Sequence, residues 1–195
     1  MTTHVHAPSG SSVEEAEFRR LRILDTVGRN LDRLNSKDRR LYAYGPLYLG
    51  TTGAICGILG NYLLRQNLKV TQHPVKTYVP LAVIPFLSTA VVYKLLVVDP
   101  LKAGDLSPEQ CVLRGGFFGL TLGAGYPTAL AFLKNGRLAV KYETVPLPPK
   151  GKAILYWATL CHPACKLMSL SMIVQVFFGS LLGYKYHEMF QNLLE

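Results

Sequence analysis

The sequence predicts an all-α, multi-pass membrane protein with four transmembrane helices, and three observations carry this prediction. Only 17% of the residues are charged, against roughly 25% in an ordinary soluble domain. These charges leave several long stretches empty. Tyrosines lie near the ends of those stretches, for example Tyr42, Tyr62 and Tyr93, as is typical of helices that cross the boundary between lipid and water.

Four uncharged runs are long enough to cross a bilayer. The first, as a helix, would extend over roughly 36 Å, and the hydrocarbon core measures about 30 Å. Lys or Arg borders every run, and these long side chains can reach the headgroups. We therefore predict a transmembrane domain over 41–195, with spans at about 41–64, 77–98, 113–133 and 167–185. A soluble bundle would need four helices that are apolar on every face, so it is the weaker alternative.

A shorter uncharged segment, Ala153–Cys165, precedes the last span. It contains Tyr156 and Trp157 and is interrupted by Pro163. These features suit a fifth, short interfacial or re-entrant helix. Whether the segment enters the membrane stays open, as does the orientation of the loops, because Lys and Arg are nearly balanced between the two sides.

The residues before the first span differ in composition. We predict a disordered tail over 1–11 and an amphipathic helix over 12–40. Ser12 followed by Glu15 fits a capping box. Apolar residues then recur every three or four positions at Phe18, Leu21, Leu24, Val27, Leu31 and Leu34. Such a helix can lie on a membrane, dock a partner or pack against its own protein.

The sequence lacks the groups that several function classes require. The net charge of +9 comes from residues that flank the spans, without a nucleic-acid-binding motif, so we expect no nucleic-acid partner. The span centres carry no ionisable side chains of the kind that transporters and intramembrane enzymes use. Cys161, His162 and Cys165 supply too few ligands, at the wrong spacing, for a zinc site. We therefore expect no catalytic residues, cofactor or metal.

Glycines at helical spacing mark the spans as surfaces for close helix packing. A small residue at every fourth position opens a groove for a neighbouring backbone. The glycines with this spacing are Gly53, Gly57, Gly115, Gly119, Gly123, Gly179 and Gly183. Two roles stay open for them, namely packing within the monomer and docking of other membrane subunits.

The stretch 134–152 is predicted to be a Pro-rich loop that binds a partner. It opens with Lys134, Asn135, Gly136 and Arg137, which together indicate a turn. Further on, Pro146, Pro148 and Pro149, followed by Lys150, favour an extended polyproline II conformation. Such a segment loses little entropy when a partner binds it. A rigid spacer is the alternative role.

Three segments identify a resemblance: KNGRLAVKYETVPLPPKG (134–151), PFLSTAVVYKLLVVDPL (85–101) and KTYVPLA (76–82). They closely resemble the transmembrane protein 126 family, and its B branch in particular, over about 42–190. The A branch shares the general pattern of spans. The resemblance implies a multi-pass protein of the mitochondrial inner membrane, without enzymatic activity, that helps to assemble respiratory complex I.

The two branches imply different clients. Membership of the B branch implies a membrane anchor in the mitochondrial complex I intermediate assembly complex, which builds the proximal membrane arm. The implied partners are Ecsit, complex I intermediate-associated protein 30, an acyl-CoA dehydrogenase-like assembly factor, hydrophobic membrane-arm subunits and membrane lipids. The A branch implies a role in a distal membrane-arm module. A small solute carrier is a further alternative, and the uncharged span centres argue against it.

Overall fold

The computed structural model describes residues 10–147 and 151–194, and these residues form helices and no strands. The α-helices are α1 (Gly10–Asn30), α2 (Ser36–Asn67), α3 (Pro74–Tyr93), α4 (Asp99–Lys102), α5 (Pro108–Phe118), α6 (Tyr126–Lys141) and α7 (Ala153–Leu194). A 3₁₀ turn, η1 (Leu31–Arg33), follows α1. Two π-helical segments, η2 (Lys94–Val98) and η3 (Gly119–Gly125), continue α3 into α4 and α5 into α6.

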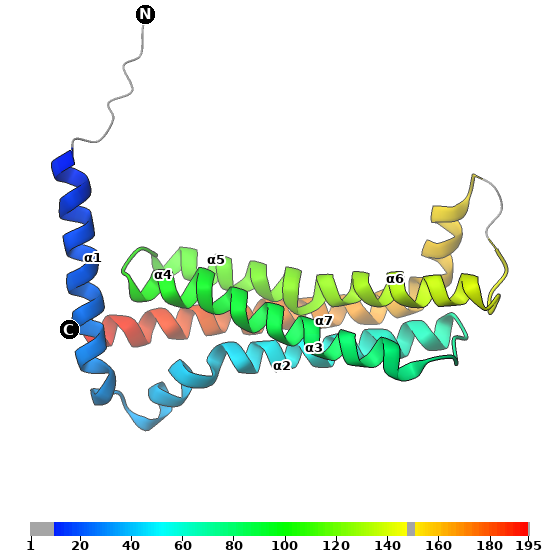
Figure 1. The fold of residues 1–195 in the computed structure, drawn as a ribbon, viewed down its shortest axis with the longest axis horizontal. Coiled ribbons are helices and arrows are strands. Elements are labelled where there is room, and N and C mark those ends of the chain that lie inside the picture. The colour runs from blue at the N-terminus through cyan, green and yellow to red at the C-terminus, as the bar shows by residue number, and fades with distance from the viewer. Residues whose placement is uncertain (1–9, 148–150, 195) are drawn as a thin grey trace, which may run out of the picture.

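Four rods in this arrangement have the length and apolar character of membrane spans. They cover Ser36–Asn67, Pro74–Lys102, Pro108–Lys141 and Thr159–Leu194. Each contains one of the spans predicted from the sequence, and the all-α, multi-pass fold class is confirmed. The rods lie side by side along one direction and form an elongated bundle (Figure 1).

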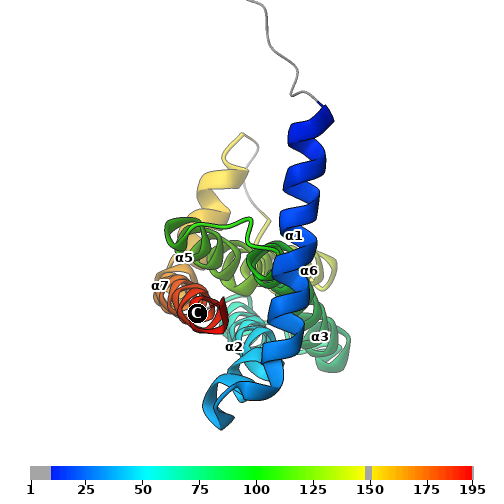
Figure 2. The same ribbon diagram turned by 90° about the vertical axis from the view of Figure 1, so that its left-hand side faces the viewer.

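Helix α1 is not part of the bundle but lies across one end of it, nearly at right angles to the spans (Figures 1 and 2). The predicted helix over 12–40 is therefore wrong at both bounds. The structure begins it at Gly10 and ends it at Asn30, and Ser36 already belongs to α2. Leu34 and Asn35 are extended, with ψ angles of 137° and 151°. This break lets α1 fold over the bundle end, where Val27 is buried and Ile23 is partly buried. Of the predicted tail, Gly10 and Ser11 are helical, and 1–9 lie outside the described residues.

The segment Ala153–Cys165 is not a separate fifth helix. It forms the first turns of α7, which runs on without a break to Leu194. Pro163 lies inside the helix, and the first turns point away from the bundle axis (Figure 1). Proline removes one backbone hydrogen bond and bends a helix without having to end it.

Prolines within the spans release backbone carbonyls, and other helices use them. Pro46 removes the usual partner of the Tyr42 carbonyl four residues earlier, and the Tyr186 hydroxyl donates to that oxygen at 3.3 Å and to Leu41 O at 2.8 Å. In the same way Pro100 frees Leu96 O, which accepts a bond from Arg114 Nη1 at 3.2 Å. This matters in lipid, where no water is available to satisfy a free carbonyl.

Both π-helical segments end just before a proline. The amide of Asp99, next to Pro100, bonds to Lys94 O, and the amide of Tyr126, next to Pro127, bonds to Thr121 O. Each bond spans five residues instead of four. The wider turn keeps the helix hydrogen-bonded up to the proline ring, so the two rods remain continuous.

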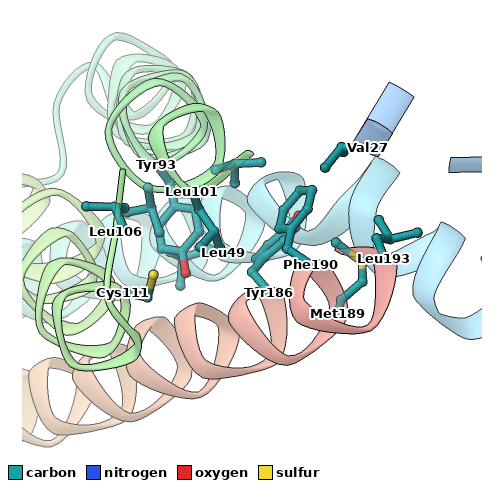
Figure 3. Close-up of a cluster of buried hydrophobic side chains, with 12 residues drawn as sticks. Val27, Leu49, Tyr93, Leu101, Leu106, Cys111, Tyr186, Met189, Phe190 and Leu193 are labelled. Atoms are coloured by element: carbon teal, nitrogen blue, oxygen red, sulfur yellow. The ribbon is translucent and has the colours of Figure 1, made fainter. Parts of the chain in front are cut away.

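Two apolar clusters hold the ends of the bundle. One joins α1, α2, α3, α4, α5 and α7 around Tyr93 and Tyr186, which are fully buried (Figure 3). Val27 of α1 and Leu193 of α7 close it at the end of the bundle. The second cluster lies at the opposite end and brings together α2, α3, α6 and the first half of α7.

Candidate functional site

The predicted glycines of α5, η3 and α7 form a seam in which two backbones touch. A Cβ atom added at Gly115 would overlap the carbonyl oxygen of Gly179, and one added at Gly119 would overlap that of Gln175. Gly183 meets the Cys111 carbonyl in the same way. Any side chain at these positions would push α7 away from its neighbour.

The remaining predicted glycines pack α2 against its neighbours. A Cβ atom at Gly53 would lie 3.3 Å from the Cα of Gly123, so these two glycines face each other across α2 and η3. A Cβ atom added at Gly57 would overlap Leu81 O. This carbonyl lacks its usual hydrogen-bond partner in the helix, because Pro85, four residues later, has no amide hydrogen. All seven glycines thus lie against other helices of the same chain, which favours packing within the monomer over docking of other subunits as their role.

One polar side chain lies buried at the centre of the bundle. Gln175 of α7 is 1% exposed. The Thr52 hydroxyl donates to its Oε1 at 3.4 Å, and its Nε2 approaches Cys56 Sγ at 3.5 Å. The centre of the bundle therefore holds an uncharged amide contact between α2 and α7.

The interpretation of Lys134, Asn135, Gly136 and Arg137 as a turn is wrong. All four lie in α6, which continues to Lys141. Asn135 is completely buried and donates to Asn61 Oδ1 at 2.7 Å and to Ala131 O at 2.9 Å. Burial of Ala131 and Ala139 in the second cluster keeps this stretch helical, because tertiary packing outweighs the weak helix propensity of Asn and Gly.

Asn135 belongs to a buried polar network that the sequence does not reveal. Asn61 Nδ2 and Arg65 Nη1 both donate to Thr77 Oγ1, at 3.2 and 3.1 Å. Arg65 Nη2 also reaches Gln72 O at 2.9 Å, and Arg65 is only 8% exposed. The convergence of these side chains depends on how α2, α3 and α6 pack.

The Pro-rich part of the predicted loop is only partly described. Val145 is buried, whereas Pro146 and Leu147 are exposed. The Tyr156 hydroxyl donates to Pro146 O at 2.7 Å and so ties the loop to the first turns of α7. Pro148, Pro149 and Lys150 lie outside the described residues.

Charge is distributed unevenly between the two ends of the bundle. The four ion pairs among the described residues all lie at the α1 end, and one of them joins Arg20 to Asp105 at 3.0 Å. In α1, the hydrogen bond from Arg29 holds the pKa of the Asp25 carboxyl below its usual value. The opposite end carries Lys69, Lys76, Lys134, Arg137, Lys141 and Lys152 against one carboxylate, that of Glu143.

A model of the family described as "Transmembrane protein 126" matches residues 21–195. The chain belongs to this family. It is 42% identical to "Complex I assembly factor TMEM126B, mitochondrial" of Homo sapiens over 195 residues, which is 100% of this chain and 84% of the relative. Its mouse counterpart is 40% identical over 187 residues, with 96% and 81% coverage. "Transmembrane protein 126A" of Mus musculus is 38% identical, with 89% of each chain covered.

The match to the family is wider than the sequence motifs indicated. We expected the likeness over about 42–190, but the family model begins at Leu21 and so includes most of α1. The human relative aligns along the whole chain. Helix α1 is thus part of what the family shares. No solved structure matches the chain.

Proposed function

We propose that this protein is a non-enzymatic assembly factor for respiratory complex I in the mitochondrial inner membrane. The observation that carries the proposal is the similarity, over 96–100% of the chain, to relatives that are named as mitochondrial complex I assembly factors. The architecture supports it. At the centre of the bundle the spans are joined by backbone contacts and by the neutral side chain of Gln175, which suits a protein that holds other proteins better than one that moves a solute.

Within that role, we propose that the protein anchors the intermediate assembly complex while the proximal membrane arm is built. Its partners would be Ecsit, complex I intermediate-associated protein 30, the acyl-CoA dehydrogenase-like factor and hydrophobic membrane-arm subunits. The TMEM126B relatives are 40–42% identical to the chain and the TMEM126A relatives 35–38%, which favours this placement over the distal module.

The surface proposed to hold a membrane-arm subunit is the outer face of α7. The glycine seams are used inside the bundle, so a client must contact an outer surface. Only 17% of the apolar window of the last span is buried, against 33–39% in the other three. Leu170, Ile173 and Phe177 form one stripe on this helix, and they are 58%, 66% and 62% exposed.

The proposal is tested by removing the protein from cells and restoring it as the wild type or as the Ile173→Ala/Phe177→Ala variant. Wild-type protein should restore complex I and co-purify with the named partners. The α7 variant should insert normally but recover less membrane-arm subunit. The matched control is Val79→Ala/Val83→Ala on α3, which changes two side chains that are 54% and 47% exposed.

Three results would count against the proposal or a part of it. Normal complex I after loss of the protein would refute an assembly role. A stalled distal module, with an intact proximal arm, would assign the chain the other role of its family. Equal loss of clients from the α7 and α3 variants would show that the α7 face is not the specific client-binding surface. It would not contradict the assembly role.

A further inference from the structure

A groove lies at the basic end of the bundle, where α6 meets the first turns of α7. Its volume is about 400 Å³, and its lining includes Phe132, Gly136, Arg137, Lys141 and Trp157. This size is within the range of roughly 300–1,000 Å³ that is typical of small-molecule sites. The groove is independent of the α7 face proposed to hold a client.

The groove is apolar at one end and cationic at the other. The residues on α6 follow one another along a single face, with Phe132 a turn before Gly136 and Lys141 a turn after Arg137. The ring of Trp157 packs edge-on against that of Phe132, with centroids 6.3 Å apart. At Gly136 an added Cβ would meet nothing within 4 Å, so the absence of a side chain keeps the floor of the groove open.

The two cations of the groove lack acidic partners in the described part of the chain. Neither Arg137 nor Lys141 takes part in an ion pair there, and both side chains are exposed. Lys141 Nζ lies 5.5 Å from the centre of the Tyr142 ring. The surrounding end of the bundle is strongly basic. An anion is the ligand that this charge distribution attracts.

The depth of the groove matches that of a phospholipid. The uncharged run of the third span ends at Leu133, and Arg137 lies roughly 6 Å and Lys141 roughly 12 Å farther along the helix. The headgroup layer on each side of a bilayer is roughly 5–8 Å thick. Helical side chains lean toward the N-terminus, so that of Lys141 leans back toward the membrane.

We propose that this groove binds an anionic phospholipid of the surrounding membrane. Arg137 and Lys141 hold the phosphate, and an acyl chain lies along Phe132, Leu133 and Trp157. Basic pockets between membrane helices recognise anionic lipid headgroups in this way. The proposal extends beyond complex I assembly and does not depend on it.

Fluorescence provides a direct test, because Trp157 is the only tryptophan in the chain. The full chain is reconstituted in dioleoylphosphatidylcholine vesicles with a fixed minor fraction of brominated phosphatidylglycerol or, separately, brominated phosphatidylcholine. Bromine quenches tryptophan only on contact. The anionic lipid should quench Trp157 more strongly, with a preference of up to roughly thirtyfold in affinity for two cations near the surface.

Two variants and a control localise the site. Arg137→Gln/Lys141→Gln should abolish the preference for the anionic lipid. Gly136→Leu places a side chain in the open floor, where its Cβ meets nothing within 4 Å, and should reduce quenching by both lipids. The control, Lys69→Gln/Lys76→Gln, removes two exposed charges from the same end but outside the groove, and it should keep the wild-type preference.

Three results of the quenching experiments would overturn the proposal. They are equal quenching by the two lipids in the wild type, an unchanged preference in Arg137→Gln/Lys141→Gln, and an equal loss of preference in the control. In the last case, diffuse charge attracts the lipid and no local site exists. Displacement of the brominated lipid by a soluble polyglutamate peptide at equal charge would assign the groove to an acidic polypeptide instead.

Discussion

At the scale of single residues, this bundle depends on glycines, which have no side chain to keep two helix backbones apart. Association of helices in lipid gains little from the hydrophobic effect, because lipid tails are as apolar as leucine. Close contact between backbones must replace it. Gly115, Gly119 and Gly179 allow this contact on one side of α7, and the carbonyl that Pro85 releases in α3 meets Gly57 of α2.

We expect Gly119→Ile to separate α7 from η3, because its Cβ would overlap the Gln175 carbonyl. Overpacking of this kind costs about 1–3 kcal/mol, so the variant should accumulate less and unfold at lower temperature in detergent. Gly28→Ile on α1 is the control, since nothing lies within 4 Å of a Cβ there. Wild-type stability of the Gly119 variant would contradict the close backbone contact between α7 and η3.

Asn61 and Asn135 should be energetically coupled. Their 2.7 Å hydrogen bond joins α2 to α6, and both side chains are completely buried. In a double-mutant cycle with Asn61→Leu and Asn135→Leu, we expect a coupling of about 0.6 kcal/mol and at most about 2 kcal/mol, as for other hydrogen bonds between membrane helices. Reversible unfolding in mixed micelles measures it. Strict additivity would show that the bond contributes nothing.

At the scale of elements, α1 is attached to the bundle by only part of its length. Val27 is 1% exposed, whereas Phe18 and Leu21 are each 63% exposed. Docking therefore depends on the second half of the helix, with Ile23 and Val27 in the apolar cluster and an ion pair from Arg20 to Asp105.

Val27→Asp should release α1 and leave the spans intact. An unpaired carboxylate in this cluster costs several kcal/mol, so trypsin cleavage after Arg29 and Arg33 should accelerate at least about tenfold, because proteolysis follows the open population. Leu21→Asp, at an exposed position, is the control. Equal cleavage of the two variants would show that the cluster does not hold α1.

Replacement of Pro146, Pro148 and Pro149 by Ala tests the loop before α7. The change keeps length and charge and frees the backbone, so insertion and abundance should be unaffected. If each proline contributes about 0.4–1 kcal/mol, partner affinity falls by roughly one to two orders of magnitude. The measurement is the recovery of each assembly partner relative to inserted protein. Unchanged recovery of every partner would make the loop a spacer.

The sequence was sufficient to predict the transmembrane helices but not the residues at which the helices begin and end. Charge-free runs locate the four spans because lipid excludes charge regardless of tertiary detail. Local signals failed where packing competes with them. Asn135 and Gly136 suggested a turn, but buried alanines keep α6 helical. Pro163 suggested a boundary, but α7 continues through it. The burial of Arg65 depends on three helices and has no local signature.

At the scale of the whole molecule, the number of spans fixes the relative position of the termini. Four spans place α1 and the end of α7 on the same side of the membrane, and Figure 1 shows the two at one end of the bundle. The groove between α6 and α7 lies at the other end.

This topology predicts the outcome of protease protection. Tags at the two ends of the chain should be digested together or protected together in mitochondria with a ruptured outer membrane. A tag inserted after Leu147 should behave in the opposite way. The protein should also resist alkaline carbonate extraction, because each span buries its apolar length in lipid. Opposite behaviour of the two terminal tags would require an odd number of spans.

The docking site of α1 also determines when this helix can dock during synthesis of the chain. Asn30 Nδ2 donates to Leu193 O at 2.9 Å, across 163 positions of the chain, and Met189 and Phe190 complete the cluster that receives Val27. During translation the first helix leaves the ribosome long before the residues that receive it exist. The full docking site of α1 therefore exists only after the last turns of α7 have been made. A chain that stops before Met189 lacks Met189, Phe190 and Leu193 of the cluster that receives Val27, and it lacks the carbonyl that Asn30 binds.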